Sequence, residues 1–173
     1  DTLKMDKPQI SDNNWEDLKK TLNIALEALD HFRLQEGQSL EKDLRLRIQN
    51  ISQRLDGIGQ YEMTRIEKLR MKLMTQIQEL KTNIEVDTNR FEQEMIYYLE
   101  KIDISEEKAR LANHLNYFLD TMDLDEGVGK KLGFISQEIG REINTLGSKA
   151  NNYDIQKLVV EMKDELEKIK EQI

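Results

Sequence analysis

The sequence predicts an all-α protein of long amphipathic helices, packed as antiparallel hairpins or a bundle with coiled-coil-like seams. Of its 173 residues, 35% are charged and only 6% are aromatic, and there is one proline. This composition is typical of helical bundles and coiled coils. Apolar residues recur at helical and heptad spacing through most of the chain, and no run alternates as a strand would.

A first long helix is predicted from just after Pro8 to about residue 56, passing through Gly37 and ending at Gly57 and Gly59. Its first half carries two apolar lines at a and d spacing. These lines are Trp15, Leu22 and Leu29, and Leu18, Ala25 and Phe32. A seam of this length is too long for a compact monomer to cover, so we expect a homo-oligomer, with an elongated monomeric bundle as the alternative.

Five further helices are predicted, over about residues 61–81, 83–102, 105–122, 130–150 and 153–173. Ser105 is expected to cap the helix at 105–122, and the apolar lines of the last helix are expected to reach Ile173. We divide the chain into a long helical hairpin over residues 1–82, as an extension, oligomerisation or clamp region, and a C-terminal helical domain over 83–173.

Charge and composition limit the possible functions. The net charge is −8, so nucleic acid would need a local basic patch or bridging metal ions. The chain has no cysteine, which excludes disulfides and thiolate metal sites and fits a reducing, cytoplasmic compartment. No apolar run approaches the ~20 residues that span a bilayer, so no membrane association is expected. The first residue is Asp1, which indicates a processed product or an excised fragment.

The predicted helix at 130–150 has one apolar face, at about 100° per residue. The members of this face are Leu132, Ile135, Ile139, Ile143, Leu146 and Ala150. Gly133, Gly140 and Gly147 follow one edge of it, seven residues apart. Each helical glycine costs about 1 kcal/mol relative to alanine, so three in register indicate a groove where a backbone or ligand comes close, unless they are chance surface glycines.

Two carboxylates lie on the opposite edge of the same helix. Glu138 and Glu142 are four residues apart, in line with Thr145 and Lys149, and they repel each other. A divalent cation, Lys149 or an arginine of another helix is expected to compensate them. Paired carboxylates on one helical face suit a hard metal ion. The alternative is a solvated glutamate edge paired with lysines, and the pattern alone favours it.

Other polar residues interrupt the apolar pattern elsewhere. His114 flanks the stripe of the helix at 105–122, in line with Glu107 and Arg110. Such a ridge suits general acid–base chemistry or metal binding, although a structural histidine is the alternative, as we expect for His31. Glu36 stands where the first heptad line requires an apolar residue, either as an interface ion pair or as part of a site.

Cationic residues could contact phosphates despite the acidic net charge. Candidates on the helix at 130–150 are Lys130, Lys131, Arg141 and Lys149, with solvated faces as the alternative. The chain contains no P-loop, no zinc-protease helix motif, no serine-hydrolase elbow and no paired-cysteine motif.

Several segments resemble one known family. The run Gln-Glu-Ile-Gly-Arg-Glu-Ile-Asn-Thr-Leu-Gly-Ser-Lys at 137–149, within the segment 129–149, is similar to the C-terminal signature of the YicC/YloC family. Segments 101–114 and 160–170 resemble the same family, and so does the weaker pattern Glu36-Gly37, Leu40 and Asp43-Leu44. Many members have aspartate where Gly133 stands.

This resemblance implies a bacterial, metal-dependent endoribonuclease that assembles as a homo-oligomer, a hexamer in the family. It also implies that the family's N-terminal region is absent from this chain. We therefore interpret the candidates as an RNA-cleaving site with Mn²⁺ or Mg²⁺. Predicted catalytic residues are His114, Glu138, Glu142 and Arg141. Predicted RNA phosphate ligands are Lys130, Lys131, Arg110 and Lys149. Predicted metal ligands are Glu138, Glu142, Glu36 and Glu107. The alternative is a non-enzymatic helical adaptor whose polar residues form interface salt bridges.

Overall fold

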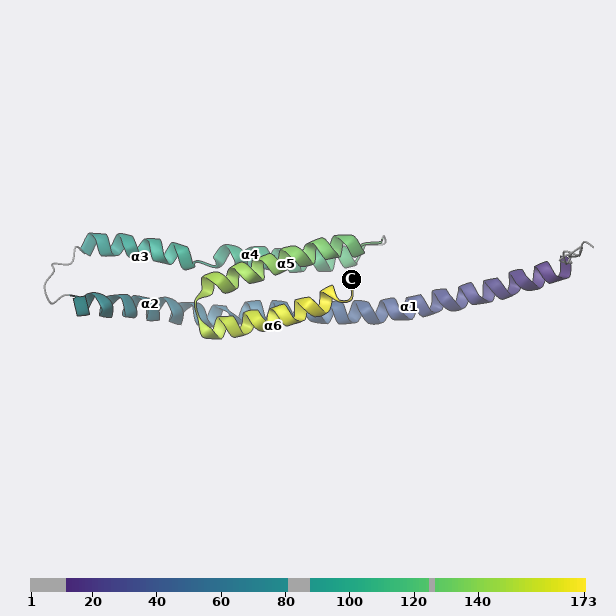
Figure 1. Ribbon diagram of the computed structural model, residues 1–173, viewed down its shortest axis with the longest axis horizontal. Coiled ribbons are helices and arrows are strands. Elements are labelled where there is room, and N and C mark those ends of the chain that lie inside the picture. The colour runs from purple at the N-terminus through teal and green to yellow at the C-terminus, as the bar shows by residue number, and fades with distance from the viewer. Residues whose placement is uncertain (1–11, 81–87, 125–126) are drawn as a thin grey trace, which may run out of the picture. The chain divides into compact units, whose positions relative to one another are not determined.

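The computed structural model describes residues 12–80, 88–124 and 127–173, and all regular elements in these ranges are α-helices (Figure 1). The helices are α1 (Asp12–Gly57), α2 (Gly59–Leu80), α3 (Thr88–Ile102), α4 (Ser105–Met122), α5 (Gly129–Ala150) and α6 (Tyr153–Lys170). The prediction of an all-α fold is confirmed. In the described ranges, no helix is both long enough and apolar enough to cross a membrane.

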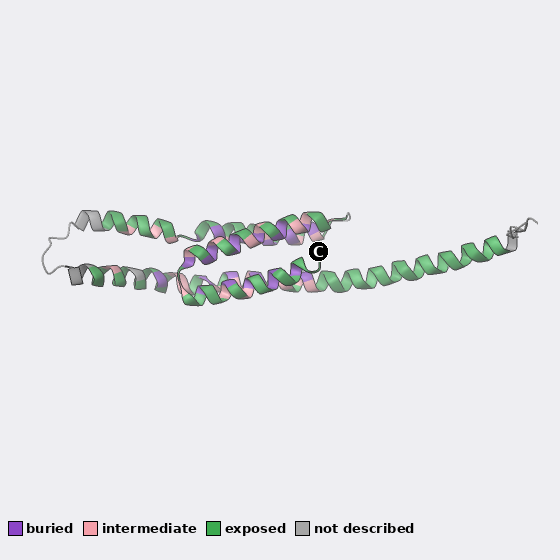
Figure 2. Ribbon diagram, viewed as in Figure 1, coloured by how far each residue is buried: buried purple, intermediate pink, exposed green. Residues whose placement is uncertain are grey.

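The chain divides into two compact units, Asp1–Lys42 and Asp43–Ile173, and α1 belongs to both. In the described part of the first unit, the predicted heptad lines are exposed: Trp15 and Phe32 keep 57% and 58% of their accessible surface. Figure 2 shows the same stretch of α1 coloured as exposed throughout. Self-association through this seam stays a prediction. The boundary that the sequence predicted at residues 82 and 83 lies outside the described residues.

Four helical segments form an antiparallel bundle in the second unit: α1 from residue 43, α4, α5 and α6. Polar contacts show the direction of α1 relative to α6. Arg47 and Arg54 of α1 contact Glu165 and Glu161 of α6 at 3.2 and 3.0 Å, so the two helices run antiparallel. Burial alone would raise the pKa of Glu165, but hydrogen bonds from Asn50, Lys168 and Arg47 outweigh it and lower that pKa.

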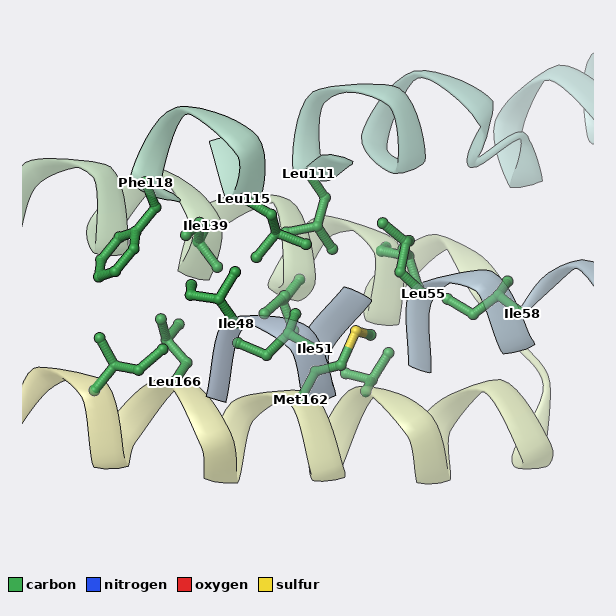
Figure 3. Packing of buried hydrophobic residues seen from close by; sticks show 14 of the residues in the cluster. Ile48, Ile51, Leu55, Ile58, Leu111, Leu115, Phe118, Ile139, Met162 and Leu166 are labelled. Carbon is green, nitrogen blue, oxygen red and sulfur yellow. The ribbon is translucent and has the colours of Figure 1, made fainter. Parts of the chain in front are cut away.

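The bundle is held together by one apolar core to which every helix contributes a stripe (Figures 2 and 3). In Figure 3, Phe118 of α4, Ile48 of α1, Ile139 of α5 and Leu166 of α6 converge on the same interior. The predicted apolar face of α5 is buried along its whole length. The prediction for the end of the last helix is wrong, since α6 ends at Lys170 and Ile173 is 40% exposed.

Between α1 and α2 the helix breaks at the predicted glycines, with Ile58 fully buried at the break. Beyond this point, α2 and α3 extend from the bundle within the second unit (Figure 1). Arg65 of α2 ties this extension to the bundle. It donates to the carbonyls of Ile102 and Ala150 at 2.8 and 2.9 Å, which are the last residues of α3 and α5. Helix C-termini leave such carbonyls unpaired and carry partial negative charge, so this cation suits both.

Helix α4 begins differently from the prediction. Its N-cap residue is Ile104, which provides no side-chain cap. The Asp103 carboxylate instead accepts hydrogen bonds from the Ser105 backbone N–H at 3.0 Å and from its hydroxyl at 2.7 Å. These bonds lower the pKa of Asp103. Ser105 is therefore a donor to the acidic residue before it and does not itself cap the helix.

Two of the three in-register glycines of α5 mark a close helix approach, as the sequence predicted. A Cβ on Gly147 would lie 3.0 Å from a methyl of Val159, and one on Gly140 would lie 3.2 Å from Leu166, both on α6. A Cβ on Gly133 would meet no atom within 4 Å. The groove that these glycines form is therefore filled by α6, and Gly133 lies outside it.

We predict opposite effects for alanine at the two ends of this row. Gly133→Ala should raise the free energy of unfolding by about 0.5–1 kcal/mol, because helix propensity improves without a clash. Gly147→Ala should lower it, because buried Val159 has little rotamer freedom with which to yield. Urea unfolding followed by circular dichroism measures both, and equal stabilisation by the two substitutions would contradict the packing described here.

Candidate functional site

Facing edges of α4 and α5 contact each other near both ends. At one end, Lys149 donates to Glu107 at 2.7 Å. At the other, the Lys131 ammonium lies 4.8 Å from the ring centre of Tyr117, a cation–π distance. We call the edge that runs between these contacts the α4–α5 seam. It consists of Glu107, Arg110, His114 and Tyr117 on α4, and of Lys131, Glu138, Glu142, Thr145 and Lys149 on α5.

The seam brings together residues that the sequence placed on separate helices. His114 lies between the two contacts on α4, at helical spacing from Glu107 and Tyr117. Glu138 and Glu142 lie between them on α5. Since α4 and α5 pack against each other, His114 and both carboxylates lie on the same seam.

Glu142 is the least compensated carboxylate of the seam. It is only 8% exposed, yet no hydrogen bond or ion pair joins it to any residue in the described ranges. Its carboxylate oxygens are not among the fully buried atoms that lack a partner in the described structure, so they retain contact with solvent. The partly buried His114 likewise has no hydrogen-bonding partner there. The sequence predicted that a divalent cation, Lys149 or an arginine of another helix would compensate this edge. In the structure Lys149 pairs with Glu107, and Glu138 pairs with Arg141 of its own helix.

Lys149 forms its ion pair with Glu107 instead. The Glu107 side chain is 6% exposed, and its second oxygen, Oε2, is buried without a partner in the described structure. The hydrogen bond to Glu107 raises the pKa of Lys149. Glu138 pairs with Arg141 at 3.1 Å, and both side chains reach solvent.

The remaining predicted phosphate ligands are spread along the bundle. Lys130 is exposed, and Arg110 is exposed and pairs with Glu106. Lys130 and Lys131 lie at the start of α5 and Lys149 lies near its end, which separates them by roughly 28 Å at the helical rise. The structure therefore does not gather these four cations into one patch.

The predicted metal ligands form no complete protein cage in the described ranges. No group of three or more His, Cys, Asp or Glu side chains there is placed to hold an ion. Glu36 is exposed in the first unit, and Glu107 already has an ammonium partner. Glu138 and Glu142 are one turn apart on α5 and remain the pair that could share an ion, because Mg²⁺ often takes one or two carboxylates together with substrate phosphates.

A pocket that the sequence analysis missed lies where α2 and α3 leave the bundle. It has a volume of about 910 Å³, and its cationic lining residues are Arg65, Lys68, Lys72, Lys101 and Lys149. We call it the basic pocket. Tyr98 also lines it, and no lining residue is acidic. One sequence signal was present: Arg65, Lys68 and Lys72 follow i, i+3 and i+7 spacing and so share a face of α2.

The structure thus defines an all-α bundle with a polar seam and a basic pocket at one end. The chain belongs to the YicC-like family, because residues 58–173 match the family model described as "Endoribonuclease YicC-like, C-terminal". The resemblance inferred from the sequence is confirmed.

Two curated relatives support this assignment, and both are named "Probable endoribonuclease YicC". The protein from Clostridioides difficile is 37% identical over 97% of this chain and 58% of its own length. The protein from Haemophilus influenzae is 32% identical over 91% of this chain and 54% of its own length. The chain spans about half the length of these relatives.

The Lys149–Glu107 pair gives a stability prediction. Lys149→Met should cost roughly 3 kcal/mol of unfolding free energy, because it leaves the Glu107 carboxylate buried and uncompensated. Lys149→Met combined with Glu107→Met should recover most of this loss, because the double variant buries no unpaired charge. Denaturant unfolding of the single and double variants measures the coupling. Strictly additive losses would show that the two side chains do not depend on each other.

Proposed function

We propose that this chain forms part of an endoribonuclease that cleaves RNA phosphodiester bonds, with His114 as general acid or base and Glu142 as a ligand of a divalent metal ion. The observation that carries the proposal is that Glu142, which is 8% exposed and has no hydrogen-bonding or ion-pair partner in the described ranges, lies on the same α4–α5 seam as His114. A carboxylate without a protein partner is available to bind a cation. The names of the relatives, which identify them as probable endoribonucleases, support the same reaction.

The seam has the groups that phosphodiester cleavage requires. One group must take a proton from the attacking oxygen, and another must protonate the leaving oxygen. The His114 imidazole can perform one of these two proton transfers, and solvent water can perform the other. Arg141 directly precedes Glu142 on α5 and is largely exposed. Its guanidinium can stabilise negative charge on the phosphoryl group in the transition state.

A divalent ion, Mn²⁺ or Mg²⁺, is part of the proposal. Glu142 and the half-exposed Glu138 would hold it together with RNA phosphate oxygens, since two carboxylates on one face are a sufficient protein contribution for Mg²⁺. The bound ion would supply charge neutralisation at the scissile phosphate. We also propose a cytoplasmic location, supported by the cysteine-free sequence, and self-association through the exposed apolar lines of α1.

We predict that His114→Ala lowers the cleavage rate at least about 100-fold, the usual contribution of a general acid or base, and that Glu142→Gln lowers it to a similar extent because the metal ion loses a charged ligand. The measurement is cleavage of labelled RNA by purified protein in the presence of Mn²⁺, with a chelator as a blank. Glu142→Gln keeps the size and polarity of the side chain, so it removes the metal-binding charge without leaving a cavity.

The matched control is Asp164→Asn, which removes one carboxylate from an exposed position of α6 and should leave the rate unchanged. Helicity and melting temperature should stay native-like in all variants. Mn²⁺ should also raise the melting temperature of the original protein, and less so that of Glu142→Gln. Undiminished cleavage by both seam variants would contradict the proposal, and ionic-strength sensitivity without any Mn²⁺ effect would favour the salt-bridged adaptor.

A further inference from the structure

The basic pocket concentrates positive charge in a chain that is acidic overall. Asp and Glu outnumber Lys and Arg by 34 to 26, yet the pocket lining contains five cations and no acid. Composition alone would therefore place more carboxylates than cations on a surface of this size. Since like charges repel and the repulsion is strongest where water is partly excluded, such a lining indicates an anionic ligand.

Arg65 supplies a charge that the protein itself compensates only weakly. It is 7% exposed, and its Nε is buried without a hydrogen-bonding partner in the described structure. Its two terminal nitrogens are held by backbone carbonyls. Burial lowers the pKa of Arg65, while the charges of Glu62 and Asp103 raise it, but a guanidinium stays protonated in proteins. The nearby Glu62 is already paired with Lys108 at 2.8 Å.

Three lysines complete the lining from two different helices. Lys68 and Lys72 lie one turn apart on α2, and Lys101 lies in the last turn of α3. All three are exposed, and no ion pair joins any of them to another described residue. They are therefore free to contact phosphate oxygens, whereas Lys149 is held by Glu107 and contributes its charge at the edge of the seam.

Tyr98 adds a flat aromatic surface to this cationic lining. Tyr98 is 44% exposed, and its ring is nearly perpendicular to that of Tyr97, with ring centres 6.4 Å apart. Aromatic rings beside a cationic groove are the usual platform on which unpaired bases stack in single-stranded nucleic acid binding.

We propose that the basic pocket binds an unpaired nucleotide of RNA, with its phosphates on Lys68, Lys72 and Lys101 and its base stacked on Tyr98. The choice of RNA as the polymer rests on the proposed function. The volume of about 910 Å³ lies at the upper end of ordinary ligand sites, which span roughly 300–1,000 Å³, so it exceeds the need of a single phosphate. A duplex keeps its bases stacked on each other and offers no base face to Tyr98. Because Lys149 belongs to both the pocket and the seam, a nucleotide held here would lead the strand toward His114.

The test measures binding of a fluorescent single-stranded RNA oligonucleotide by anisotropy, with chelator present and in the His114→Ala background, so that no cleavage occurs. Lys68→Glu combined with Lys72→Glu should weaken binding about tenfold or more, and should reduce the slope of log affinity against log salt by roughly 1.4, since each lost phosphate contact removes about 0.7. Tyr98→Ala should weaken it about 5- to 50-fold, whereas Tyr98→Phe, which keeps the ring, should stay within about twofold.

The charge-matched control is Lys42→Glu combined with Lys163→Glu, two exposed lysines outside the pocket lining, which should bind nearly as well as the parent. The proposal is overturned if this control loses as much affinity as the pocket variant, if the Tyr98 variants both bind normally, or if an RNA duplex competes as well as the single strand. Loss of cleavage without loss of binding in His114→Ala would support both proposals. If the parent protein binds the RNA but does not cleave it, the nuclease proposal is contradicted, whereas the proposal that the basic pocket binds RNA is supported.

Discussion

The antiparallel packing of α4 on α5 is the constraint on which the rest of the structure depends. The apolar stripes of the two helices set their distance, and the Lys149–Glu107 and Lys131–Tyr117 contacts set their register. A slide of one helix past the other would change the position of His114 relative to Glu138 and Glu142 and would also break the Lys149–Glu107 pair at the edge of the basic pocket. The same packing therefore positions both the seam and the charge beside it.

Local charge, and not net charge, decides what this molecule can bind. The net charge of −8 argues against attraction of a polyanion by the whole chain, but fields close to a surface follow the nearest groups. Most carboxylates of the bundle are paired, as Glu165 is with Arg47 and Glu161 with Arg54. The cations of the basic pocket are mostly left unpaired. Pairing of acids in one region and exposure of bases in another gives an acidic protein a basic site.

Most of the fold could be predicted from the sequence because helical periodicity is a local property. The buried face of α5 and the break at Gly57 and Gly59 follow from spacing alone. Pairing between helices is not local. The sequence places Lys149 and Glu142 on the same edge of one helix, but in the bundle Lys149 donates a hydrogen bond to Glu107 of α4.

The basic pocket was missed for the same reason. Its cations come from α2, α3 and α5, and only their packing brings them together. Sequence reasoning did single out His114 and Glu142, because each borders an apolar stripe on its own helix, but it did not pair the two helices. Residues that break a local pattern can be identified from sequence, whereas residues that fit a solvated face reveal a shared site only in three dimensions.

The most direct test of the account follows the two histidines by nuclear magnetic resonance while a non-hydrolysable RNA analogue is added to protein containing isotope-labelled histidine. The chain has only His31 and His114, so each ring gives its own signal, and His31, exposed on α1, serves as the internal reference. If RNA is bound along the α4–α5 seam, the His114 ring signals shift and those of His31 stay in place. Movement of His31 alone, or of neither ring at saturating RNA, would contradict the account.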